Sequence, residues 1–150
     1  DSVLGLATGS TPLRAYEHMV SLYRQGAVDF SKVTTFNLDE YCRLDVKDKN
    51  SYHTFMYENL FNHINIPDEN INFLNGNAWD LETECKKYEQ KIKAAGGIDI
   101  QLLGIALGEK KAKAIKQVID GNVTPECPAS ILQFHKDVTL MLDRDAAKLL

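Results

Sequence analysis

Two adjacent acids, Asp39 and Glu40, follow directly after an apolar run with high β-propensity. The run, residues 33–36, consists of β-branched and aromatic residues, which predicts a strand. Ligands of parallel α/β sheets gather at the carboxyl ends of strands, so both carboxylates are expected where a substrate would bind. A carboxylate there can act as a general base, a metal ligand, a helix cap or a solvated charge, and these residues alone leave the choice open.

A second candidate site is the loop of residues 8–12, which separates an apolar run, residues 2–7, from an amphipathic helical pattern that starts at residue 13. A strand–loop–helix junction presents unpaired N–H groups and the positive end of the helix dipole, which favours a phosphate. Gly9 would let the backbone approach an anion closely. The loop also carries three hydroxyl donors, on Thr8, Ser10 and Thr11. Either these residues bind an anion, or Ser10 or Thr11 only caps the helix.

Lysines mark the start of another helical pattern, which begins near residue 107 and runs to residue 121. Lys110, Lys111 and Lys113 lie in its first turns, where the helix dipole favours acids. Either these lysines are solvated charges, or one of them reaches an anion that is held nearby.

The rest of the chain alternates patterns of strand and helix. Ser51 is a plausible N-cap for one helix, and residues 80–95 predict another. Short extended segments are predicted at residues 71–74, 98–103 and 138–142, with a last helix beginning at residue 143. This alternation predicts an α/β fold with a mostly parallel sheet and helices on both faces. A length of 150 residues is typical of a single domain.

Composition narrows the classes of partner. The chain has 17 basic and 21 acidic residues, well mixed, so neither nucleic acid nor an anionic membrane surface is an expected partner. No apolar run approaches the roughly 20 residues that a membrane span needs, and the start does not resemble a secretory signal. Because no initiator Met is present, we expect a piece of a longer protein. The three cysteines have no CxxC spacing, which predicts no disulfide framework, no metal site and a cytoplasmic location.

Three stretches together resemble the glucosamine-6-phosphate deaminases, a branch of the sugar-phosphate isomerase-like proteins. They are residues 3–12 (VLGLATGSTP), 35–41 (TFNLDEY) and 50–53 (NSYH). The similarity continues with residues 75–78, 84–89, 99–105, 107–112 and 128–147, and so covers nearly the whole chain. The resemblance implies a Rossmann-like α/β fold and conversion of glucosamine 6-phosphate and water to fructose 6-phosphate and ammonia, without a cofactor.

The resemblance also implies roles for individual residues. By match of motif, Asp39 is the carboxylate that moves a proton between C2 and C1 of the sugar, and Glu40 belongs to the same catalytic motif. Residues 8–11 match the loop that holds the phosphate, and Lys111 matches a lysine that assists it. The loop and the lysine, each ambiguous alone, would then bind one anion, the phosphate of an amino sugar.

Compared with the family's pattern, the sequence is expected to lack the opening strand and helix, an internal block after Ile105 and the C-terminal tail. After Ile105 the family continues with a His-Ile-x-Phe-Asn-Glu-Pro segment, whose His and Glu open the sugar ring, and with a mobile lid. Here Ala106 follows Ile105 at once. Either the sequence omits an internal segment that the protein has, or the chain is truly shortened. In the second case we expect little or no deaminase activity, because ring opening loses its acid–base groups.

Two other functions remain as alternatives. A non-catalytic sugar-phosphate sensor shares the fold, but the chain has no helix-turn-helix pattern and keeps the residues 37–41 (NLDEY) intact. A 6-phosphogluconolactonase-like hydrolase shares the Gly-Ser-Thr-Pro loop, but is not expected to carry the Asp-Glu-Tyr stretch followed by residues 50–53. The sequence leaves open whether copies of the chain associate into a homo-oligomer.

Overall fold

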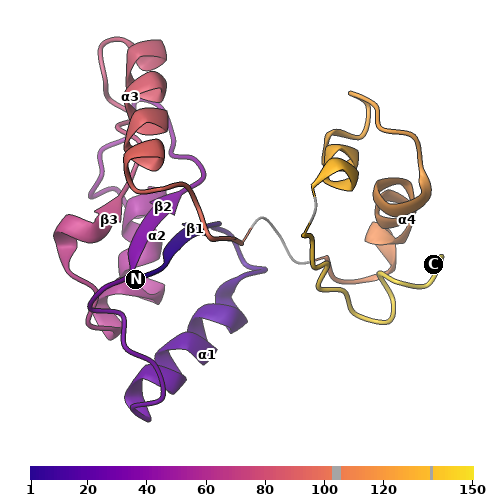
Figure 1. Cartoon of the computed structure of the whole chain (residues 1–150), viewed down its shortest axis with the longest axis horizontal. Coiled ribbons are helices and arrows are strands. Elements are labelled where there is room, and N and C mark those ends of the chain that lie inside the picture. The colour runs from indigo at the N-terminus through magenta and orange to yellow at the C-terminus, as the bar shows by residue number, and fades with distance from the viewer. Residues whose placement is uncertain (103–105, 136) are drawn as a thin grey trace. The chain divides into compact units, whose positions relative to one another are not determined.

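The computed structural model describes residues 1–102, 106–135 and 137–150. The chain divides into two compact units, Asp1–Leu103 and Gly104–Leu150, and each is described by itself (Figure 1). The expectation of one domain over residues 1–150 stays a prediction. The expected discontinuity between residues 105 and 106 lies outside the described residues, because Ile105 is not among them.

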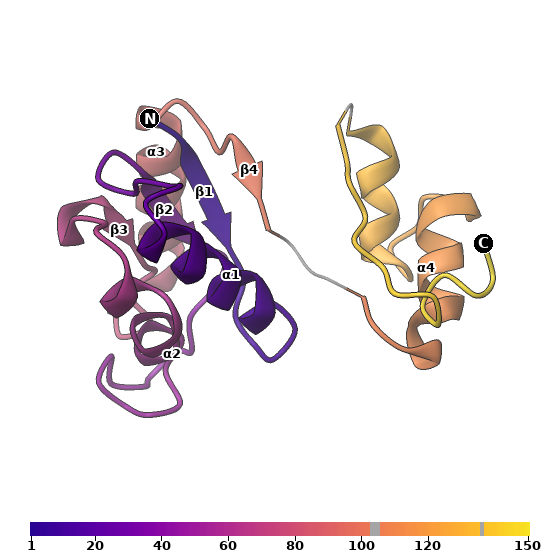
Figure 2. The same ribbon diagram turned by 90° about the horizontal axis from the view of Figure 1, so that it is seen from below.

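The first unit is built on a four-stranded parallel sheet with the strand order β3-β2-β1-β4. The strands are β1 (Val3–Leu6), β2 (Thr34–Asn37), β3 (Ile71–Asn72) and β4 (Ile100–Gln101). Figure 2 shows β4 beside β1. In the register of the two long strands, Leu6 lies opposite Asn37, so β1 and β2 end at the same level of the sheet.

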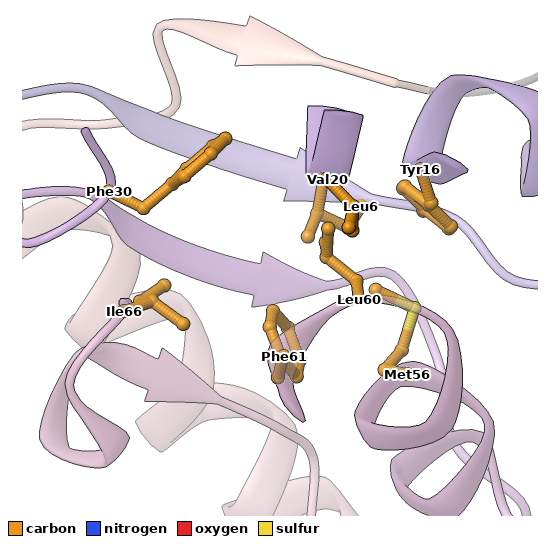
Figure 3. Packing of buried hydrophobic residues seen from close by; sticks show 8 residues of the cluster. All are labelled: Leu6, Tyr16, Val20, Phe30, Met56, Leu60, Phe61 and Ile66. Carbon is orange, nitrogen blue, oxygen red and sulfur yellow. The ribbon is translucent and has the colours of Figure 1, made fainter. Parts of the chain in front are cut away.

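Helices cover both faces of this sheet. On one face, Leu6 packs with residues of α1 (Leu13–Arg24) and α2 (Tyr52–Asn59), as Figure 3 shows. On the other face, Tyr88 of α3 (Leu81–Ala94) packs edge-on against Phe36, with ring centroids 5.5 Å apart. Leu6 and Phe36 face opposite ways because successive side chains of paired strands alternate. The predicted α/β fold, with helices on both faces of a parallel sheet, is confirmed.

Local chemistry explains where the helices begin. The Ser51 side chain accepts a hydrogen bond from the Thr54 N–H, so the predicted cap of α2 is confirmed. Asp80 caps α3 in the same way, by accepting from the N–H groups of the second and third helical residues. Two 3₁₀ turns, Phe61–His63 and Asp68–Asn70, complete the first unit.

The second unit consists of a 3₁₀ turn (Glu109–Lys111), α4 (Ala112–Asp120) and a 3₁₀ helix (Pro128–Phe134). The predicted strand at residues 138–142 is wrong. Among the described residues, this segment forms one isolated bridge, between Ala106 and Leu142, whereas a strand needs a series of such pairs. The helix predicted from Asp143 is also wrong. The Asp143 carboxylate instead accepts hydrogen bonds from the N–H groups of Gly108 and Ala146, and residues 144–149 form turns.

Within the described ranges, no helix is long and apolar enough to cross a membrane. The same residues contain no cluster of three or more His, Cys, Asp or Glu side chains that could hold a metal ion.

Candidate active site

The two segments that the sequence singles out meet at the carboxyl edge of the sheet. Thr8 lies just beyond β1 and Asp39 just beyond β2, and the backbone N–H of Leu38 donates to the Leu6 carbonyl oxygen at 3.1 Å. In the order β3-β2-β1-β4, β2 and β4 lie on opposite sides of β1. The loop after β1 therefore lies at the switch point where open α/β sheets bind ligands.

The loop after β1 keeps its polar groups free of helix capping. The N-cap of α1 is Pro12, without a side-chain hydrogen bond, so the interpretation that Ser10 or Thr11 caps the helix is wrong. Gly9 has a φ of 96°, a left-handed conformation that glycine adopts readily, and a Cβ there would meet no atom within 4 Å. The start of the loop is held by α1, because the Tyr16 hydroxyl of this helix donates to the Ala7 carbonyl oxygen.

Glu40 fastens the turn after β2 to the start of α2. Its Oε1 accepts from the Tyr52 N–H at 3.0 Å, and its Oε2 accepts from the His53 N–H at 2.8 Å. Oε1 also accepts from the N–H of the next residue, Tyr41, at 2.8 Å. The first N–H groups of a helix lack partners within the helix and carry its positive end, so a carboxylate there is stabilising. Both Glu40 oxygens are thus engaged in holding the backbone.

Asp39 differs from Glu40 in its exposure and in its hydrogen bonding. It is exposed, and its carboxylate has no hydrogen-bond partner among the described residues. Partial desolvation by burial, and then the negative charge of Glu40, raise the pKa of the Asp39 carboxyl above its ordinary value. A carboxylate that is free of partners and has a raised pKa is a better proton acceptor than an ordinary aspartate.

Tyr52, singled out from the sequence only as part of residues 50–53, packs against the turn after β2. Its hydroxyl donates to the Tyr41 hydroxyl at 3.3 Å, and the two rings lie 4.7 Å apart. The bond to Tyr41, burial and the charge of Asp39 raise the pKa of the Tyr52 phenol. Tyr52 thus packs on the turn after β2, and it lines one hollow with Gly9 of the loop after β1. The available signal was its position directly after the Ser51 cap, on a helix that starts at this edge of the sheet.

An open hollow of about 560 Å³ lies at this place in the first unit. Gly9, Tyr41 and Tyr52 contribute to its lining, together with two cationic residues, Arg43 and Lys49. Arg43 has a φ of 62°, which is unusual for a residue other than glycine. Most of the lining is apolar, and the two cationic side chains favour a ligand with a negative charge.

Lys111 belongs to the second unit, where it ends the 3₁₀ turn Glu109–Lys111 and is exposed. The N–H of Gly108, just before this turn, donates to the Asp143 carboxylate at 2.9 Å. That Lys111 and the loop after β1 bind one anion stays a prediction, since the two units are described separately.

Comparison with known proteins decides the family. Residues 2–106 match the model of the glucosamine-6-phosphate isomerases/6-phosphogluconolactonase. The chain belongs to this family. Among its relatives, the glucosamine-6-phosphate deaminase of Thermoanaerobacter sp. (strain X514) is 38% identical, with 100% of this chain and 84% of the relative covered. The deaminase of Clostridium botulinum (strain Eklund 17B / Type B) is 42% identical, with 100% and 86% covered.

Solved structures of family members agree with the fold. A monomeric glucosamine-6-phosphate deaminase superposes with a TM-score of 0.95 at 32% identity, over 100% of this chain and 88% of that chain. A 6-phosphogluconolactonase from Thermotoga maritima gives a TM-score of 0.57 at 23% identity, over 75% of this chain and 48% of that one, and supports the fold alone.

The family relatives are longer than this chain within the matched range. The alignments with the two named deaminases run over 213 residues, whereas the whole chain has 150. The relatives therefore contain residues inside the matched range that have no counterpart here.

Proposed function

We propose that this chain is a glucosamine-6-phosphate deaminase, which converts glucosamine 6-phosphate and water to fructose 6-phosphate and ammonia. Relatives of that name match the whole chain. The observation that carries the proposal is the meeting of two groups at one edge of the sheet. A loop whose hydroxyls cap no helix follows β1, and the neighbouring β2 is followed by Asp39, which has no hydrogen-bond partner among the described residues.

In this proposal the phosphate binds at the loop after β1. The start of α1 offers N–H groups without a side-chain cap, and Gly9 leaves open space above the backbone. Hydroxyls add neutral donors that a phosphate oxygen accepts from. The residues of the first unit that we assign to phosphate binding are Thr8, Gly9, Ser10 and Thr11.

Asp39 is the proposed general base. Its carboxylate takes the proton from C2 of the open-chain amino sugar and returns it to C1, while a proton of the amino group passes to the O1 oxygen, which converts the amino aldose into the imine of a ketose. Water then releases the nitrogen as ammonia. The raised pKa of the Asp39 carboxyl makes its carboxylate a stronger proton acceptor, which assists proton transfer.

Glu40, predicted as a second catalytic residue, is better suited to positioning. Its two oxygens accept three backbone N–H groups, which leaves them poorly placed to move a proton. By fixing the turn to α2 it sets the direction of Asp39, and its charge supports the raised pKa of that group.

Phosphosugar binding without turnover is the second candidate function. It is favoured by the relatives' greater length within the matched range. The resemblance assigns ring opening to a His and a Glu that have no counterpart after Ile105. A chain that joins Ile105 to Ala106 would act only on sugar that has opened by itself, so little ammonia is expected.

Calorimetric titration and ammonia release separate these functions. The deaminase proposal predicts that glucosamine 6-phosphate binds and that ammonia release, however slow, exceeds the uncatalysed rate. Binding of glucosamine 6-phosphate without ammonia release above the uncatalysed rate would favour the non-catalytic sensor. Hydrolysis of 6-phosphogluconolactone with no affinity for the amino sugar would replace the proposal by the lactonase.

We also place the protein in the cytoplasm, where its free cysteines would remain reduced.

A further inference from the structure

The lining of the hollow in the first unit includes two cationic residues, Arg43 and Lys49. Neither of them takes part in the ion pairs that form among the described residues. Asp45 and Asp48, which lie close to them along the chain, instead accept backbone N–H groups of their own loop. The charges of Arg43 and Lys49 are thus not neutralised by an ion pair within this part of the chain.

The backbone of Arg43 is held at the hollow by the turn that contains Gly76. The Arg43 N–H donates to the Gly76 carbonyl oxygen at 2.9 Å, and the Asn77 side chain donates to the Leu44 carbonyl oxygen at 2.7 Å. A Cβ on Gly76 would overlap the Tyr41 carbonyl oxygen, so glycine is needed for this close approach. Arg43 itself has a φ of 62°, which glycine would adopt more easily. Backbone strain of this kind gathers at functional sites.

The backbone of Lys49 is held by the loop that leads into α2. The Ser51 hydroxyl donates to the Val46 carbonyl oxygen at 2.7 Å, and the Ser51 N–H donates to the Asp48 carbonyl oxygen at 2.9 Å. Both bonds are made by a buried serine that also caps the helix. The backbone of Lys49 is therefore positioned at the hollow before a ligand binds.

The loop after β1 reaches the same hollow, because Gly9 is part of its lining. The donors of this loop are neutral N–H groups and hydroxyls, which carry no full positive charge. We propose that Arg43 and Lys49 bind the phosphate of the substrate together with the loop after β1. The inference deepens the proposed function and rests on it, because it concerns how the same site recognises the charge of its ligand.

The two cations suit a phosphate in different ways. The planar guanidinium of Arg43 can donate two parallel hydrogen bonds to two phosphate oxygens, whereas the ammonium of Lys49 acts as a point charge. One charge-assisted hydrogen bond corresponds to about a tenfold change in affinity. Both residues are exposed, so added salt should weaken the attraction.

The test measures the Kd for glucosamine 6-phosphate and for inorganic phosphate in the full chain. Arg43→Gln and Lys49→Gln are each expected to raise both Kd values about tenfold. Lys47→Gln is the matched control, since Lys47 lies in the same loop, is exposed and is not among the described residues that line the hollow. It removes the same charge, and its Kd values are expected to stay close to those of the wild type.

Arg43→Gly separates binding from folding. Glycine relieves the left-handed conformation, so urea denaturation should show a variant at least as stable as the wild type, while its affinity for phosphate falls as in Arg43→Gln. Retained affinity in Arg43→Gly, or Kd values in Arg43→Gln and Lys49→Gln equal to those in Lys47→Gln, would overturn the inference and leave the proposed function standing. A wild-type chain that does not bind glucosamine 6-phosphate would instead overturn the proposed function.

Discussion

The loop after β1 and the turn after β2 follow neighbouring strands, yet the structure holds them in different ways. The turn is fastened: Glu40 accepts from the first N–H groups of α2, and Ser51 caps the same helix. The loop is left open: α1 starts without a side-chain cap, and Gly9 takes a left-handed conformation with free space above it. A rigid support for a base and open donors for an anion are what a phosphosugar site requires.

The largest expected effect concerns the residue that the fastened turn presents. Asp39→Asn keeps the size of the side chain but removes the base, so the rate of ammonia release should fall at least about a hundredfold. The affinity for glucosamine 6-phosphate should be retained, because the phosphate binds at the other segment. Turnover close to that of the wild type would rule out Asp39 as the base.

Loss of the fastening itself should lower stability. Glu40→Ala leaves two N–H groups of α2 without their carboxylate partner, and we expect the free energy of unfolding to fall by about 2 kcal/mol. Urea denaturation measures this change. Glu40→Gln, which retains an acceptor oxygen, is the control and should lose less. Equal stability of Glu40→Ala and the wild type would mean that water replaces the carboxylate without cost.

Two serines test the contrast most directly. Ser51→Ala removes a buried cap and should cost about 1 kcal/mol of unfolding free energy. Ser10→Ala should change stability by less than about 0.5 kcal/mol, since an exposed residue that caps no helix is replaced. It should, however, weaken the binding of inorganic phosphate. Equal destabilisation of the two variants would contradict the claim that the turn after β2 is held by a helix cap and the loop after β1 is not.

The smallest expected effect is on the titration of Asp39. Glu40→Gln removes a negative charge that helps to raise the pKa of Asp39, so this pKa should fall. It should stay above the ordinary value, because burial is the larger cause and is unchanged. Any activity that needs the Asp39 carboxylate declines as the pH drops through the pKa of Asp39. Because this pKa is lower in Glu40→Gln, the acidic side of the pH–activity profile should move to lower pH. ¹³C NMR of the aspartate carboxyl groups measures the shift, and an upward shift would contradict its assigned cause.

Local sequence chemistry was sufficient for much of the fold. The end of β2, the Gly9 loop and the Ser51 cap each depend on residues close together in the chain, and each was predicted. The predicted strand at residues 138–142 failed because a strand exists only through its neighbour, and its one bridge, to Ala106, joins positions far apart in the sequence.

The site was predicted only in part, for the same reason. Asp39 and the loop follow recognisable strand ends, but the contact of Tyr52 with Tyr41 is tertiary and has no spacing signature. The sequence also did not show that Asp39 and Glu40 have different roles. Glu40 and Asp39 are adjacent and chemically alike, and only the position of α2 gives one of them three N–H donors.

The central claim is that the anion at the loop after β1 and the carboxylate of Asp39 share one site. It is tested most directly by titrating the Asp39 carboxyl by ¹³C NMR with and without inorganic sulfate, which keeps its double charge throughout. Charges within about 10 Å of each other interact at ordinary salt, so a sulfate held by the loop should raise the pKa of Asp39 further. A pKa that stays the same while sulfate is bound would separate the two groups and contradict the account.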